Sequence, residues 1–144
     1  MLRVCRPAGT VGMLNFTPEG LISEFFDALA PYMPPPLPDA QAPAMWGSES
    51  HVRKLFGDRV EALEMTRGDY VEHADSPRDY RELVKATFGP VVAAYADLAE
   101  DPERAAALDR DFLDFAVRAN GGPPGGPAEY RYEYLLVIAR RASA

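Results

Sequence analysis

The chain is poor in the residues that build metal sites and disulfides. Its 144 residues include one cysteine, Cys5, and two histidines, His51 and His73. A lone cysteine excludes an internal disulfide, and these three side chains are too few for the four nitrogen and sulfur ligands of a structural zinc site. The sequence therefore predicts no bound metal.

Positive charge is also scarce. The 15 Lys and Arg residues are outnumbered by 22 Asp and Glu, which gives a net charge of −7. Binding to a nucleic acid backbone needs a clustered positive surface, which this balance disfavours. No apolar run approaches the roughly 18 residues of a membrane helix, and Met1 to Pro7 lacks the apolar core of a signal peptide. We expect a cytoplasmic protein that binds neither nucleic acid nor membranes.

Familiar catalytic motifs are missing. The sequence has no Gly-x-Gly-x-x-Gly, no Gly-x-Ser-x-Gly and no phosphate loop ending in Gly-Lys-Ser or Gly-Lys-Thr. His51 could act as a general base, but a surface histidine is the more common case. Asp109 and Asp111 lie about 200° apart on a helix, so they cannot converge on one substrate and are expected to be solvated. The catalytic residues are therefore unknown.

What is present is the composition of a folded domain. Hydrophobic residues make up 47% and charged residues 26% of the chain, and 144 residues suffice for one core, so we expect one domain over residues 1–144. Its fold class is α/β, because three segments have strand patterns. They are Thr10–Phe16, Val60–His73 as one long or two short strands, and Tyr130–Arg140. In the last, the run Leu-Leu-Val-Ile-Ala predicts burial on both faces.

Several helices separate these strands. Each expected start has a Ser, Thr or Asp that can cap free N–H groups: Thr17, Ser48, Ser76 and Asp101. The first helix should run to about Ala30. Pro31 to Gly47 contains six prolines, which predicts an extended segment, and its apolar residues, Trp46 among them, favour a packed lid.

The segment LRVCRPAGTVGMLNFTPEG, Leu2 to Gly20, resembles the turn and fifth strand of class I S-adenosylmethionine-dependent methyltransferases of the ubiquinone/menaquinone-biosynthesis type (methyltransferase type 11-like). Pro7 and Gly9 match the family's proline-glycine-glycine turn, and Ala8 replaces its first glycine. The proline-rich lid ending in Trp46, the HVRKLFG helix and the closing EYLLVIARR strand are also similar to this family. The resemblance implies a partial Rossmann-like, mixed sheet of about three strands, equivalent to strands 5, 7 and 6.

The resemblance covers only the C-terminal, substrate-side half of that family. Its cofactor lies against a glycine-rich turn after the first strand and an acidic residue after the second, neither of which is in this sequence. It therefore implies no cofactor-binding residues here, an inactive lone chain and a separate cofactor-binding half for methyl transfer to a small molecule. Asn15, Thr17 and Pro18 match the edge where the family's substrate enters, and with Trp46 they are our substrate-binding candidates. Equally, Asn15 and Thr17 could serve only the turn and the helix cap.

The resemblance also has a consequence for partners. In the family a fourth strand pairs with the fifth, so its absence leaves an apolar edge open and removes helices that cover the sheet. This predicts a homodimer, association with a separately encoded N-terminal half, or poor solubility. The alternative function is a module without catalysis, either binding a small hydrophobic ligand under the lid or serving dimerisation.

Overall fold

The computed structural model describes residues 1–35 and 41–143, which form three strands and five α-helices together with short 3-10 turns. The chain is organised as two compact units. Unit 1 comprises Met1–Ile22, Gln41–Tyr70 and Tyr132–Ala144, and unit 2 comprises Ser23–Ala40 and Val71–Arg131. We describe each unit by itself.

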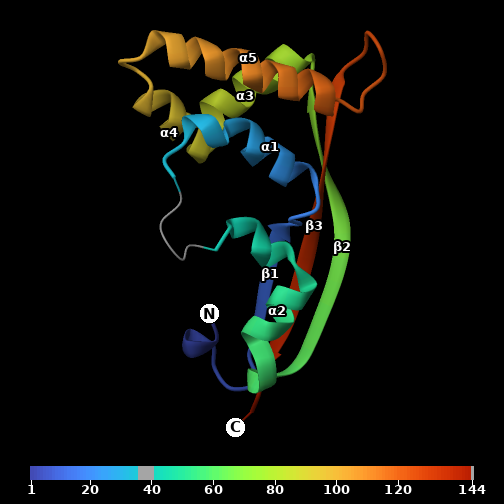
Figure 1. Ribbon diagram of the computed structural model, residues 1–144. Helices are drawn as coiled ribbons and strands as arrows, with labels where there is room; N and C mark the ends of the chain where they lie inside the picture. The colour runs from blue at the N-terminus through green and yellow to red at the C-terminus, as the bar shows by residue number, and fades with distance from the viewer. Residues whose placement is uncertain (36–40, 144) are drawn as a thin grey trace. The chain divides into compact units, whose positions relative to one another are not determined.

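The strands are β1 (Thr10–Phe16), β2 (Val60–Ala74) and β3 (Ala128–Arg141), and their order is β1-β3-β2 (Figure 1). The last strand of the chain is therefore the central one. It pairs antiparallel with β1, with Thr10 opposite Arg140 and Phe16 opposite Tyr134. The expected mixed sheet is wrong, because β3 runs opposite to both of its neighbours and the two strands that share a direction are not adjacent.

The core of unit 1 lies between this sheet and α2 (Glu49–Phe56). Val52 and Phe56 are one helical turn apart and share the helix face that meets the sheet. Gly57 ends α2 with a φ of +52°, a value that favours glycine, and its N–H donates to the Arg53 carbonyl. Alternate strand residues complete the core, which consists of Met13, Val52, Phe56, Leu135, Val137 and Ala139.

The opposite face of the sheet is less covered. Leu14 is 54% exposed, Leu136 37% and Ile138 38%. Burial on β3 alternates here, with Leu135, Val137 and Ala139 buried between the exposed positions. The expected burial on both faces is therefore wrong for Leu136 and Ile138, because they point away from α2.

Unit 2 is built around helices and aromatic rings. It contains most of α1 (Leu21–Leu29) together with α3 (Pro77–Thr87), α4 (Gly89–Asp97) and α5 (Pro102–Ala119). The Phe25 ring makes edge contacts at 5.4–5.7 Å with Phe26, Phe88, Phe112 and Phe115. Such edge-to-face pairs are favoured because the positive ring edge meets a negative face. None of the described helices combines the length and apolar character needed to cross a bilayer.

Helix starts follow the predicted caps in two cases. Ser76 accepts a hydrogen bond from the Asp79 N–H at 3.2 Å, and Asp101 accepts one from the Arg104 N–H at 3.1 Å. Ser48 precedes α2 as expected, but its hydroxyl makes no cap and lies 3.1 Å from the Ser50 hydroxyl. The predicted Thr17 cap is wrong, because α1 begins only at Leu21.

The proline-rich segment is only partly described. Residues 36–40 of the expected lid lie outside the described residues. On either side, Ala30–Tyr32 and Pro43–Gly47 form 3-10 turns where an extended conformation was expected. Both turns have proline at one of their first two positions, where its missing N–H costs no hydrogen bond.

The aromatic core of unit 2 can be tested on one helix. Phe112 is fully buried on α5, whereas Val117 on the same helix is 59% exposed. We expect Phe112→Ala to lower the free energy of unfolding by ~3–5 kcal/mol, because the cavity removes ring contacts. The control Val117→Ala should change it by less than ~0.5 kcal/mol. Urea denaturation followed by circular dichroism measures both, and equal effects would contradict the assigned core.

Candidate functional site

A shallow hollow lies along the free edge of β1 in unit 1. Its volume is about 300 Å³, and it is lined by Met1, Met13, Leu14, Asn15 and Trp46. Three of these residues are consecutive in β1, and successive strand residues point to opposite faces. The hollow therefore follows the edge of the strand and is not confined to one face of the sheet.

Gly47 fixes the tryptophan beside this edge. A Cβ at Gly47 would lie 2.0 Å from the Phe16 carbonyl oxygen and 2.9 Å from the Thr17 Cα, so the backbone of the Pro43–Gly47 turn packs directly on the end of β1. Only glycine allows so close an approach. This contact places Trp46 next to Asn15, although 31 positions separate the two in the sequence.

The four predicted substrate-binding residues have different surroundings. Asn15 and Trp46 line the hollow together, and among the described residues no hydrogen bond engages the side-chain amide of Asn15. Thr17 is fully buried, and its N–H at 2.9 Å and hydroxyl at 3.5 Å both donate to the Glu133 carbonyl oxygen. Pro18 lies in the following turn, which Gly20 closes by donating to the Thr17 carbonyl. Substrate binding by these residues stays a prediction, and Thr17 in addition anchors β1 to β3.

His51 is a neighbour of the hollow that sequence reasoning set aside. It lies in the first turn of α2, half-buried, and its ring meets the Trp46 ring edge-on with 6.3 Å between the centroids. Its Nε2 is buried and has no hydrogen-bond partner among the described residues. A buried imidazole nitrogen without a partner is costly. In the sequence it stands just after the Ser48 helix start, and this position alone did not distinguish it from a surface histidine.

Two further hollows adjoin this region. One of about 220 Å³ shares Met1 and Trp46 with the first and extends to Leu55, Phe56 and Arg59. The other, about 370 Å³, is lined by three arginines and one aspartate among its residues, namely Arg3, Arg59, Arg141 and Asp58. Two of these guanidinium groups already donate to backbone carbonyls, Arg59 to Leu55 and Phe56 and Arg141 to Cys5. In this hollow of about 370 Å³, the Arg59 and Arg141 guanidinium groups therefore have fewer N–H groups left to donate to a ligand.

The described residues do not fit a bound metal or S-adenosylmethionine. Across residues 1–35 and 41–143, no three His, Cys, Asp or Glu side chains gather at a metal-binding distance. The segment between β1 and α1 is Thr-Pro-Glu-Gly, which carries a negative charge and a single glycine. It is unlike the glycine-rich turn that receives such a cofactor in nucleotide-binding α/β proteins.

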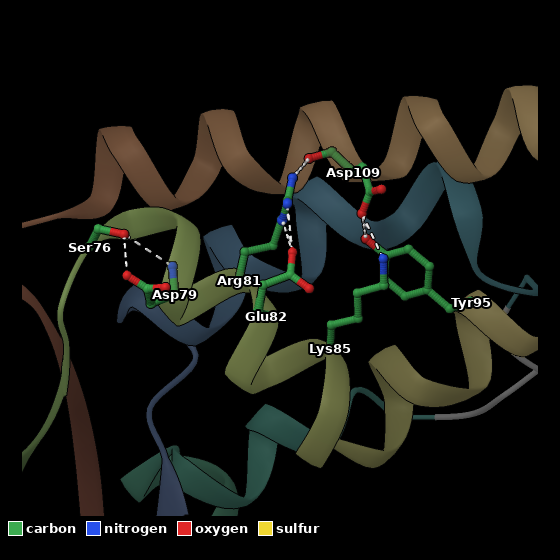
Figure 2. Close-up of polar contacts among 7 residues, drawn as sticks. All are labelled: Ser76, Asp79, Arg81, Glu82, Lys85, Tyr95 and Asp109. Atoms are coloured by element: carbon green, nitrogen blue, oxygen red, sulfur yellow. Dashed lines mark hydrogen bonds and ion pairs between the residues drawn. The ribbon is translucent and has the colours of Figure 1, made fainter.

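Unit 2 contains a polar cluster that joins three helices (Figure 2). The Asp109 carboxylate on α5 accepts hydrogen bonds from Lys85 of α3 at 3.1 Å and from the Tyr95 hydroxyl of α4 at 2.6 Å. Arg81 donates to the Asp109 carbonyl oxygen at 3.1 Å. Asp109 is therefore not the solvated charge we expected. Asp111 instead accepts a hydrogen bond from Tyr32, so the two carboxylates have separate partners.

The pKa values in this cluster indicate a structural role. Burial raises the pKa of Asp109, but the hydrogen bonds from Tyr95 and Lys85 and the charges of Lys85 and Arg81 outweigh it and leave the pKa below its ordinary 3.8. Burial and the hydrogen bond to Asp109 raise the pKa of Tyr95 above its ordinary 10.0. At neutral pH the carboxylate stays charged and the phenol stays neutral. Neither group is suited to exchange protons with a substrate at that pH.

Gly47 can be tested through the single tryptophan. We expect Gly47→Ala to lower the free energy of unfolding by ~1–3 kcal/mol or more, because the new methyl group overlaps the Phe16 carbonyl. Gly89→Ala is the control, since a Cβ there meets no atom within 4 Å. Trp46 is the only tryptophan in the sequence, so its fluorescence should also shift in the first variant. An unchanged spectrum and stability would contradict the close packing.

Asp109 makes stability depend on pH. Because its folded pKa lies below the unfolded value, the carboxylate stabilises the fold above pH 3.8, and this stabilisation is lost as the pH falls through the folded pKa. We expect Asp109→Asn to be destabilised at neutral pH and to approach the parent chain as the pH falls below 3.8 and through the lowered pKa of Asp109. Urea midpoints across this range measure the difference. A constant difference at all pH values would contradict the ionic role.

No protein-family model matches the chain, but similar proteins occur in mycobacteria. Uncharacterized protein Rv1405c of Mycobacterium tuberculosis is 34% identical over 142 residues, covering 98% of this chain and 50% of the relative. Uncharacterized protein Rv1403c of the same organism is 32% identical over 148 residues, with the same coverage. Uncharacterized protein Mb1440c of Mycobacterium bovis matches with the same identity and coverage as Rv1405c. The chain spans about half the length of the curated relatives it matches.

Proposed function

We propose that the chain is the substrate-side half of a class I S-adenosylmethionine-dependent methyltransferase acting on a small molecule. The observation that carries this proposal is the strand order β1-β3-β2, in which the last strand lies between the first two. This is the order implied for strands 5, 7 and 6 by the sequence resemblance. A sheet built from simple hairpins would instead place the strands in chain order.

The open edge of the sheet supports the same proposal. Among the described strands, β1 lies at one end of the sheet and pairs only with β3. The relatives are about twice as long as this chain, so each has a further segment of similar size. The described residues do not fit S-adenosylmethionine, and we therefore assign the cofactor, the source of the methyl group, to a separate half.

The residues of this chain would bind the acceptor molecule. The hollow is lined by residues from the carboxyl half of β1, and open α/β sheets bind ligands at the carboxyl ends of their strands. Trp46 offers a rigid apolar surface, and the Asn15 amide can donate and accept hydrogen bonds. Together they suit a flat, mainly apolar molecule with one polar group.

The alternative is a module that binds a small hydrophobic ligand without catalysis. The lining of the hollow favours it, because Met1, Met13, Leu14 and Trp46 are apolar and only Asn15 is polar. Such a module would bind the same ligands but would need no methyl donor. Binding of S-adenosylmethionine by the assembled protein separates the two proposals.

A chimera tests the proposal. In this protein, the present chain replaces the matching half of Rv1405c, and binding of S-adenosylmethionine is measured by isothermal titration calorimetry beside intact Rv1405c and the lone chain. We expect the chimera and Rv1405c to bind it and the lone chain to bind none. Folded Rv1405c and chimera that both fail to bind would overturn the proposal and leave the non-catalytic alternative.

The acceptor site has its own test in the same chimera. With S-adenosylmethionine carrying a labelled methyl group and a bacterial metabolite extract, we expect a labelled product. Trp46→Ala should lower its yield at least tenfold without changing cofactor affinity, because it removes acceptor contacts only. Val117→Ala, at an exposed position of α5, is the matched control. A yield that is unchanged by Trp46→Ala would exclude this hollow as the acceptor site.

A further inference from the structure

The three hollows of unit 1 are neighbours. The hollow along β1, here called the Trp46 hollow, shares Met1 and Trp46 with the hollow of about 220 Å³, here called the middle hollow. The middle hollow shares Leu2, Arg3 and Arg59 with the hollow of about 370 Å³, here called the arginine hollow. Among the described residues the Trp46 and arginine hollows have no lining residue in common. The three therefore form one groove with the middle hollow between the other two.

The lining of this groove changes from apolar to charged. In the Trp46 hollow only Asn15 is polar. The middle hollow adds the apolar side chains of Leu2, Leu55 and Phe56. The arginine hollow has three positive charges and the one negative charge of Asp58, which leaves an excess of two in a chain whose net charge is −7. A ligand that fits the whole groove is therefore apolar at one end and negatively charged at the other.

Backbone contacts orient two of the arginines. Arg59 donates from Nε to the Phe56 carbonyl at 3.2 Å and from Nη2 to the Leu55 carbonyl, and Arg141 donates from Nη1 to the Cys5 carbonyl. The Arg59 Nη1 group and the Arg141 Nε and Nη2 groups are not used in these bonds. Among the described residues no hydrogen bond or ion pair engages Arg3. Each arginine therefore has N–H groups left for an anion.

The arginine hollow is also assembled by the fold. Its arginines come from the start of the chain, from the 3-10 turn Gly57–Arg59 and from the end of β3. The Ala142 N–H donates to the Arg59 carbonyl at 3.1 Å, and the Arg141 N–H donates to the Gly9 carbonyl at 2.9 Å. These bonds hold the three segments together, so the positive charges do not converge by chance of sequence proximity.

We propose that this groove binds one molecule that has an apolar body and a carboxylate or phosphate group. The body lies against Trp46, an apolar chain follows the middle hollow, and the anion accepts hydrogen bonds in the arginine hollow. The planar N–H fork of a guanidinium group matches both oxyanions. This inference rests on the acceptor hollow in the proposed function and names the class of acceptor, an amphiphilic acid or phosphate ester.

The size of the groove favours a single ligand. None of the three hollows exceeds about 370 Å³, which is at the lower end of the roughly 300–1,000 Å³ of small-molecule pockets. Together they fall well within that range. An inorganic anion held in the arginine hollow alone is the competing possibility, and the experiment below separates the two.

The test is isothermal titration calorimetry of the chain with naphthylalkanoates of increasing chain length. The matching naphthylalkyl phosphates, the matching neutral alcohols and inorganic phosphate are titrated beside them. We expect short acids and alcohols to bind alike at the Trp46 hollow, and longer acids or phosphates to bind more tightly than the alcohols of the same length. Only a chain that spans the middle hollow brings the anion to the arginines. The tighter of the two anionic series identifies the preferred anion.

Two variants should change this binding in opposite directions. Arg3→Gln should weaken binding of the long anionic ligands about fivefold, and Asp58→Asn should strengthen it about twofold, because one removes an attraction and the other a repulsion. Neither should change binding of the alcohols. Both side chains are exposed and have no hydrogen bond or ion pair among the described residues, so both variants should fold as the parent does. Arg78→Gln, at an exposed position of α3, is the matched control.

Two results would overturn the inference. The first is equal binding of acids, phosphates and alcohols at every chain length. The second is inorganic phosphate that binds as tightly as the long phosphates, which would make the arginine hollow a separate anion site. If the chimera binds S-adenosylmethionine and either result is found, this inference alone fails. If the expected preferences are found and the chimera binds no cofactor, the proposed methyltransferase alone fails.

Discussion

The fold depends on the insertion of β3 between β1 and β2. Residues at the two ends of the described chain meet in this sheet, with Thr10 opposite Arg140. The Arg141 N–H also donates to the Gly9 carbonyl, and the Ala142 N–H to the Arg59 carbonyl. Each of these contacts closes a loop of many residues, and such closure is entropically costly before the strands pair. Neither edge strand reaches the other, so the sheet exists only once β3 is in place.

The same insertion supports the candidate site. Thr17 at the end of β1 donates twice to the Glu133 carbonyl of β3, and so fixes where the first strand ends. The Pro43–Gly47 turn packs on that end through Gly47, which brings Trp46 beside Asn15. The hollow is thus positioned on a strand by backbone contacts, and sites built on strands are held more precisely than sites on loops. Its geometry depends on a glycine and a threonine whose side chains do not line it.

Patterns of neighbouring residues predicted strands and helix starts, whereas contacts between residues far apart in the sequence determined the partners of Thr17 and Asp109. The apolar run Thr10–Phe16 was predicted with its observed bounds, and the Ser76 and Asp101 caps were confirmed, because each depends on neighbouring residues. Thr17 has the same capping chemistry, but its hydroxyl donates a hydrogen bond to the Glu133 carbonyl, 116 residues away, and caps no helix. Asp109 likewise finds Lys85 and Tyr95, 24 and 14 positions earlier. No local pattern records such partners.

The same division applies to the candidate residues, whose role in substrate binding stays a prediction. The four candidate residues were chosen for their place at the end of a strand and on a proline-rich segment. The structure brings Asn15 and Trp46 to one hollow, and this proximity arises from the glycine contact, which the sequence does not reveal. The half-buried His51 beside Trp46 was not among the candidates, because its burial depends on the packing of α2 and the preceding turn.

In the second half of β3, the sequence pattern and the observed burial of the side chains disagree. A strand with one solvated face alternates apolar and polar residues, and the first half of β3 does so with Arg131 and Glu133. From Leu135 to Ala139 no polar residue occurs, yet Leu136 and Ile138 are more than one third exposed. The change in pattern falls where β3 pairs with the uncharged strand β1. From Leu135 to Ala139 the apolar pattern of β3 therefore exceeds the burial that the described residues provide.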